Sequence, residues 1–127
     1  MKRIQTWIVL FSVCILAACS SSSAGPAQAV EGYFKALVAK DAAKAKSISC
    51  AAWESNAQTD ADTFAVYPAT LEALSCKETG RTGDTADVTC TGKMILDYNG
   101  DKQEINLADR GYLAKLEGGD WRMCGYQ

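Results

Sequence analysis

The chain has 127 residues, of which 48% are hydrophobic, and its 13 basic and 15 acidic residues give a formal net charge of −2. The chain is slightly acidic and has no stripe of clustered lysine and arginine, which nucleic-acid binding relies on. We therefore expect no nucleic-acid partner. The chain contains no histidine, which excludes Ser-His-Asp and Cys-His nucleophile arrangements within it and removes the commonest metal ligand.

Residues 1–18 have the pattern of a secretory signal peptide. Lys2 and Arg3 precede an almost wholly apolar run that ends at residue 18, which is shorter than the roughly 20 apolar residues of a membrane-spanning helix. The sequence LAAC at residues 16–19 resembles the bacterial lipobox, in which small residues fit the signal peptidase and the cysteine thiol accepts diacylglycerol. The pattern therefore predicts cleavage before Cys19 and lipid, palmitate included, on Cys19.

The residues after Cys19 support this interpretation over an ordinary signal peptide with an incidental cysteine. The sequence SSSSAGP at residues 20–26 is polar and flexible, as a tether should be. Two or three acyl chains, at about 0.8 kcal/mol per buried methylene, would hold the protein to the extracytoplasmic side of the cell membrane. In the lipoproteins that it resembles, aspartate at position 20 causes retention at the inner membrane. Ser20 therefore favours the outer membrane in a cell that has two.

We predict a signal peptide over residues 1–18, a lipidated tether over residues 19–27 and one small domain over residues 28–127. Apolar side chains recur at helical steps of three and four in residues 28–40: Val30, Phe34, Leu37 and Val38. Asp41 is placed to cap a second, short helix that ends before Cys50. The polar residues 56–63 are predicted to form a loop or a frayed helical turn.

Strand patterns follow the helices. We expect four strands over residues 70–79, 86–98, 105–116 and 121–126, with turns at residues 80–84, 99–100 and 118–119. Alternation places one set of side chains on the same face of the second strand: Val88, Cys90, Met94, Leu96 and Tyr98. Asn99-Gly100 is the strongest short hairpin signal. Helices followed by strands predict an α+β domain, with helices packed on one face of an antiparallel meander sheet of about four strands.

Both ends of this domain resemble the nuclear-transport-factor-2-like superfamily. Residues 30–45 (VEGYFKALVAKDAAKA) are similar to its opening helices, and residues 118–125 (GGDWRMCG) to its last strand, where a polar turn leads into a core tryptophan. The resemblance implies a cystatin-like cone, in which a curved sheet wraps around helices. It also implies either an isomerase, dehydratase or cyclase with Asp–His or Asp–Tyr in the mouth of the cone, or a non-catalytic binding domain.

Four cysteines lie beyond the predicted lipidation site: Cys50, Cys76, Cys90 and Cys124. An even number in a small exported domain favours two disulfides. A zinc site is disfavoured because no C-x-x-C pair occurs. Cys76 and Cys90 are equidistant from Gly83, so a regular hairpin would place them opposite each other. We prefer the pairs 76–90 and 50–124, and the alternative joins Cys50 to Cys76 or Cys90.

Several aromatic side chains are candidates for a ligand pocket: Trp53, Tyr67, Tyr98 and Tyr112. Phe34, Leu37 and Trp121 are expected in the core. Asp60 and Asp62 resemble the start of a calcium loop, but the other ligands of such a loop are missing, so we expect no metal and no cofactor.

We expect a non-catalytic, lipid-anchored module of the cell envelope that binds a small apolar ligand or an envelope protein. No residue is predicted to be catalytic. One alternative is a small pocket enzyme that uses Asp and Tyr, which would show a carboxylate within hydrogen-bond reach of a tyrosine inside an apolar pocket. The other is a structural accessory subunit of an envelope complex, which would show a filled cone and an exposed apolar patch.

Overall fold

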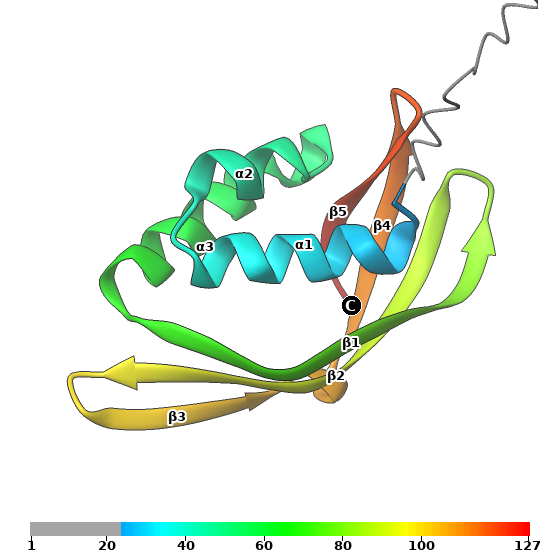
Figure 1. The fold of residues 1–127 in the computed structure, drawn as a ribbon. Coiled ribbons are helices and arrows are strands. Elements are labelled where there is room, and N and C mark those ends of the chain that lie inside the picture. The colour runs from blue at the N-terminus through cyan, green and yellow to red at the C-terminus, as the bar shows by residue number, and fades with distance from the viewer. Residues whose placement is uncertain (1–23) are drawn as a thin grey trace, which may run out of the picture.

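The structure is a computed structural model that describes residues 24–127. The predicted signal peptide, Cys19 and most of the tether lie outside the described residues. Within them, the helices are α1 (Pro26–Val38), α2 (Ala42–Ser47), the 3-10 turn η1 (Ala51–Trp53) and α3 (Glu54–Val66). The strands are β1 (Ala69–Thr82), β2 (Thr85–Tyr98), β3 (Asp101–Asn106), β4 (Gly111–Glu117) and β5 (Asp120–Tyr126), with the 3-10 turn η2 (Leu107–Asp109) before β4. The helices cover one face of a strongly curved antiparallel sheet (Figure 1), so the α+β prediction is confirmed.

Local sequence explains where the first two helices begin. Pro26 is the first residue of α1. Backbone N–H groups in the first turn have no acceptor within the helix, so proline, which lacks this group, is tolerated there. Asp41 caps α2, as expected, because its side chain accepts a hydrogen bond from the Lys44 amide at 2.9 Å. Pro26 and Ala27 are buried parts of α1, so the folded domain begins at least two residues before the predicted boundary at residue 28. No helix within residues 24–127 is long and apolar enough to cross a membrane.

Helix α3 corrects the prediction of a loop or a frayed helical turn over residues 56–63, because these residues form regular helix. Its buried face consists of two alanines one turn apart, Ala57 and Ala61, so it lacks the large apolar side chains that would reveal helical periodicity. The hydroxyls of Thr59 and Thr63 donate to backbone carbonyls four residues earlier. Small residues therefore let α3 pack against the other helices without a large apolar stripe.

Strand β2 is the centre of the sheet. It pairs with β1 along one edge, while along the other edge its first part pairs with β4 and its second part with β3. The prediction of one strand over residues 105–116 is therefore wrong. Asn106 ends β3, and its side chain accepts from the Ala108 amide at 3.1 Å, which starts the η2 turn. The chain then leaves β3 and returns beside β2 as β4, giving five strands instead of about four.

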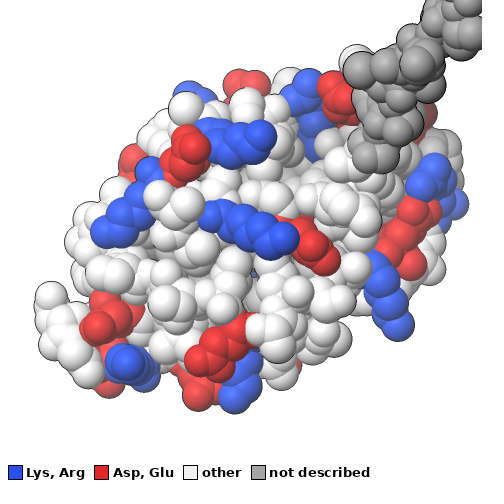
Figure 2. Space-filling model, in the orientation of Figure 1, with Lys and Arg blue, Asp and Glu red and all other residues white. Residues whose placement is uncertain are grey.

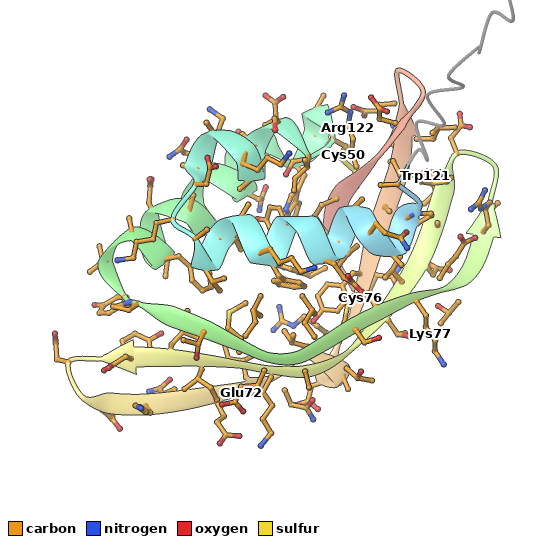
Figure 3. The ribbon with its side chains drawn as sticks, in the orientation of Figure 1. Cys50, Glu72, Cys76, Lys77, Trp121 and Arg122 are labelled. Atoms are coloured by element: carbon orange, nitrogen blue, oxygen red, sulfur yellow. A yellow bond between two sulfur atoms is a disulfide. The ribbon has the colours of Figure 1, made fainter. Side chains whose placement is uncertain are left out.

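A sharp bend in β1 and β2 gives the sheet its curvature (Figure 1). Ala73 and Gly92 both adopt positive φ angles, 52° and 101°. A Cβ atom at Gly92 would lie 2.5 Å from the Glu72 carbonyl oxygen, so only glycine allows the strands to approach this closely. In Figure 3, Cys76 lies on the helix side of β1, whereas Glu72 and Lys77 point away from the helices. The bend therefore wraps the inner face of the sheet around α1.

The core lies between α1 and the inner face of the sheet. Phe34 and Leu37 are buried there, as expected. Trp121 is only half-buried, which corrects its assignment to the core. It lies at the start of β5, where the Arg81 guanidinium from β1 covers its ring at 4.6 Å. A tryptophan at this hairpin tip thus packs on the core from outside and stacks with a cation.

The structure joins Cys50 to Cys124 and Cys76 to Cys90, the pairing that we preferred. The register of the hairpin gives an unexpected reason for the second bond. The turn is centred between Gly83 and Asp84, with Thr82 opposite Thr85, which alone would displace the two cysteines by one position. An irregularity between Glu78 and Gly80 restores the register, and Cys76 faces Cys90 directly.

Candidate functional site

A cavity of about 240 Å³ lies between the helices and the inner face of the sheet. Its lining is mainly apolar and comes from α1, α3, all strands from β2 to β5, and the segment around η2: Phe34, Leu37, Asp60, Thr63, Phe64, Met94, Leu96, Tyr98, Ile105, Leu107, Arg110, Tyr112 and Tyr126. Met94, Leu96 and Tyr98 of β2, which follow the bend at Gly92, line this space together with residues of α3. Side chains therefore do not completely fill the space between the helices and the curved sheet.

One carboxylate joins three elements at the wall of this cavity. Asp60 of α3 accepts hydrogen bonds on the same oxygen, Oδ2, from the hydroxyls of Tyr33 on α1 and Tyr126 on β5, both at 2.6 Å. Tyr33 is fully buried and Tyr126 is half-buried. Hydrogen bonds to an ionised acceptor are short and roughly twice as strong as neutral ones. The cluster of Tyr33, Asp60 and Tyr126, here the Tyr–Asp–Tyr cluster, therefore holds both helices to the last strand.

Burial keeps both tyrosines of this cluster protonated. Desolvation raises the pKa of Tyr33 well above its ordinary value, and the hydrogen bond to Asp60 raises it further. Desolvation also raises the pKa of Tyr126, with further upward contributions from the neighbouring Tyr33 and Asp60. Loss of either proton would place a second negative charge beside the carboxylate in a poorly hydrated site. Both hydroxyls therefore act as permanent donors to Asp60.

A third tyrosine of the cavity wall also has an engaged hydroxyl. Tyr112 is buried and donates to the Leu107 carbonyl oxygen at 2.8 Å. Burial raises its pKa, so the hydroxyl remains a donor. This bond fixes η2 against β4, and the ring packs edge-on against Phe34. Tyr112 therefore shapes the cavity and supplies no free proton to it.

Arg110 brings the only positive charge among the lining residues. Its side chain is exposed, and its guanidinium carbon lies 5.2 Å from the centre of the Tyr126 ring. Among residues 24–127, five ion pairs occur and none involves Arg110. On the face of the molecule shown in Figure 2, acidic and basic side chains are interspersed. Arg110 is thus a cation without a carboxylate partner at the outer part of the cavity.

The structure divides the four candidate pocket residues into two pairs. Tyr98 and Tyr112 line the cavity. Trp53 lies outside it, where η1 follows the disulfide-bonded Cys50 and presses the indole edge-on against Tyr126. Tyr67 is also outside, with its ring 4.4 Å from that of Tyr98 where α3 leads into β1. Trp53 and Tyr67 therefore pack against cavity residues from outside the cavity.

The sequence does not single out the residues that are chemically most distinctive here. It predicts a loop or a frayed helical turn around Asp60, it offers no spacing that pairs Tyr33 with an aspartate, and it does not indicate Tyr126 or Arg110 for the pocket. A signal existed for Asp60, since it lies three residues after Ala57 and directly before Ala61, on the side of a helix that those alanines bury. No group of three His, Cys, Asp or Glu that could hold a metal occurs within residues 24–127.

The chain matches no family model and no curated protein. Among solved structures, it is similar to an NTF2-like protein with a cystatin-like fold from Novosphingobium aromaticivorans. The TM-score is 0.50 and the identity 13%, over 76% of this chain and 73% of the other. At this identity the likeness concerns the fold alone, and it supports the cystatin-like cone that the sequence predicted.

Proposed function

We propose that this chain is a lipid-anchored module of the cell envelope, which binds a small and mainly apolar molecule in the cavity without converting it. The observation that carries the proposal is the cavity itself, about 240 Å³ of space with a largely apolar lining. Ligand pockets usually enclose about 300–1,000 Å³. The occupant should therefore be small, with roughly the bulk of a single substituted ring.

The state of the polar groups supports binding over chemistry. The hydroxyls of Tyr33 and Tyr126 are committed to Asp60, and that of Tyr112 is committed to a backbone carbonyl. A general acid or base must exchange a proton with its substrate, so it needs a pKa near the working pH. The raised pKa values of these tyrosines suit them to hold a wall in place.

Two threonines of α3 allow a matched test of the cavity. Thr63 lines the cavity and Thr59 does not, although both are exposed and both donate to a carbonyl one turn earlier. We expect Thr63→Phe to fill the cavity and weaken binding of the neutral probe 4-methylphenol at least tenfold, as measured by calorimetry. Thr59→Phe should bind like the unchanged protein. Equal affinity in the two variants would refute a ligand site in this cavity.

The anchor rests on the lipobox sequence and needs its own experiment. Intact mass spectrometry of protein extracted from membranes should find acyl chains on an N-terminal Cys19. The Cys19→Ser variant should appear in the soluble fraction with its domain folded. An unmodified Cys19, or cleavage at another position, would contradict the anchoring proposal and leave the cavity proposal intact.

The Tyr–Asp–Tyr cluster favours one alternative, a small pocket enzyme that uses Asp60. A carboxylate bonded to tyrosines beside an apolar cavity is the arrangement expected for such an enzyme. Asp60→Asn, which keeps the shape of the side chain, separates the two functions. If the chain only binds, the unchanged protein and the variant should release the same molecule after purification from cells. An enzyme would convert a molecule that Asp60→Asn retains, and mass spectrometry of the released molecules would reveal it.

A further inference from the structure

Arg110 and Asp60 place opposite charges beside one aromatic ring, that of Tyr126. Asp60 bonds to the hydroxyl of Tyr126, while the Arg110 guanidinium lies over the ring of the same tyrosine. The two charges form no ion pair with each other within residues 24–127, although both line the cavity. A ligand in the cavity beside Tyr126 can therefore meet a cation and a carboxylate.

Arg110 and Asp60 differ in their exposure to solvent and in the hydrogen bonds that they can still form. Arg110 is exposed, so it lies at the mouth, while Asp60 contacts the fully buried Tyr33 and so lies deeper. Both tyrosines donate to Oδ2 of Asp60, and within residues 24–127 its Oδ1 accepts no hydrogen bond. A carboxylate oxygen in this position can accept from a ligand hydroxyl.

The surroundings of Arg110 favour an anionic ligand group. Within residues 24–127 the Arg110 guanidinium forms no ion pair, and the planar fork of its N–H donors matches a carboxylate. Its neighbour Asp109 is engaged, because Oδ1 of Asp109 accepts from the Asn106 side chain at 3.1 Å. The positive charge of Arg110 would also offset the repulsion between a ligand carboxylate and Asp60.

We propose that the occupant of the cavity is a small hydroxy acid with a ring-sized apolar body, whose carboxylate is bound by Arg110 and whose hydroxyl faces Asp60. This inference rests on the proposed binding function and specifies the ligand class. The apolar body would contact apolar residues that line the same cavity, among them Phe34, Met94 and Leu107. The charge on Arg110 distinguishes this ligand from a neutral molecule of the same shape.

Three related probes test the proposal by calorimetry: 4-hydroxybenzoate, its neutral analogue 4-hydroxybenzamide, and benzoate, which lacks the hydroxyl. We expect 4-hydroxybenzoate to bind at least tenfold more tightly than the amide and several-fold more tightly than benzoate. Its affinity should also fall with added salt, because the guanidinium is exposed. Arg110→Gln should reduce the affinity for 4-hydroxybenzoate to within about twofold of that for the amide.

The control is Lys102→Gln, which removes an exposed cation from β3 that does not line the cavity. It should leave the affinity for 4-hydroxybenzoate unchanged. Equal binding of acid and amide to the unchanged protein, or an advantage of the acid that survives in Arg110→Gln, would overturn the hydroxy-acid proposal while leaving the binding function in place. If neither these probes nor 4-methylphenol binds, the binding function itself fails.

Discussion

Two regions of the molecule are held together by different interactions. One is the contact between α2 and β5 around the Cys50–Cys124 disulfide, and the other surrounds the cavity. Where α2 meets β5, the bond between Cys50 and Cys124 is reinforced by backbone hydrogen bonds, from Cys50 N to Met123 O and from Met123 N to Ile48 O, both 2.8 Å. Around the cavity, α1, α3 and β5 meet through side chains that converge on Asp60. No cysteine among residues 24–127 lines the cavity. The stability that the disulfides supply should therefore be separable from ligand binding.

Removal of a disulfide should cause the largest loss of stability. The bond between Cys50 and Cys124 closes a sequence separation of 74 residues, against 14 for Cys76 and Cys90. Loop-closure entropy predicts losses of about 4 kcal/mol for Cys50→Ala/Cys124→Ala and about 3 kcal/mol for Cys76→Ala/Cys90→Ala. Urea denaturation measures both.

Where either double variant still folds, its affinity for 4-methylphenol should stay within about twofold of that of the unchanged protein. A large loss of affinity in a folded variant would show that the disulfide and cavity regions are coupled.

Loss of the central carboxylate should have the next largest effect. Asp60→Ala leaves the hydroxyls of Tyr33 and Tyr126 without their acceptor. At about 1–3 kcal/mol for each unsatisfied buried group, we expect a loss of about 3 kcal/mol together with weaker ligand binding. The control is Asp62→Ala on the same helix, since Asp62 is exposed and bonds only to Gln58. Similar losses of stability in the two variants would contradict the role of Asp60 in holding α1, α3 and β5 together.

High pH should weaken the cavity region selectively. The folded protein raises the pKa of Tyr33 and Tyr126 above the ordinary value of 10.0, so the unfolded chain releases these protons first. Their contribution to stability is therefore complete below pH 10 and falls as the pH rises above it, by up to about 1.4 kcal/mol per pH unit for each group. Between pH 10 and pH 11.5, denaturation curves of the unchanged protein should lose stability more steeply than those of Tyr33→Phe/Tyr126→Phe. Parallel slopes would contradict the buried state of these hydroxyls.

The smallest effect is expected at the hairpin between β2 and β3. Gly100 has a φ of 96° with open space around it, and Asn99 has a φ of 56°. Gly100→Ala should cost about 1 kcal/mol from backbone strain alone, whereas Asn99→Gly should be nearly neutral. Hydrogen exchange should then increase in β3 and stay unchanged around Cys50. Faster exchange around Cys50 would show that a local change spreads across the sheet.

Features with a local cause were predictable from the sequence. The alternation of Val88, Cys90, Met94 and Leu96 and the Asn99–Gly100 turn depend on neighbouring residues, so the strand and its hairpin followed from pattern alone. The resemblance at both ends of the domain then indicated the cone. The break in residues 105–116 was less visible, because Asn106 ends a strand through a hydrogen bond of its side chain to Ala108.

Features that depend on tertiary contacts were not predictable. Helix α3 packs through Ala57 and Ala61, and two small residues give only a weak helical period, so the placement of Asp60 beside them was easily missed. The Tyr–Asp–Tyr cluster joins residues 27 and 66 positions apart in the chain. Even the preferred bond between Cys76 and Cys90 depends on an irregularity near Thr79 that no sequence signal indicates.

A methyl NMR titration with 4-hydroxybenzoate tests the central claim, that the cavity binds a small molecule, most directly. Leu37, Met94, Leu96 and Leu107 line the cavity, whereas Leu113 does not. We predict that the methyl signals of the four lining residues shift together along one binding curve, while those of Leu113 stay in place, and that Thr63→Phe abolishes these shifts. Unchanged signals from all four lining residues, or shifts confined to Leu113, would contradict the account.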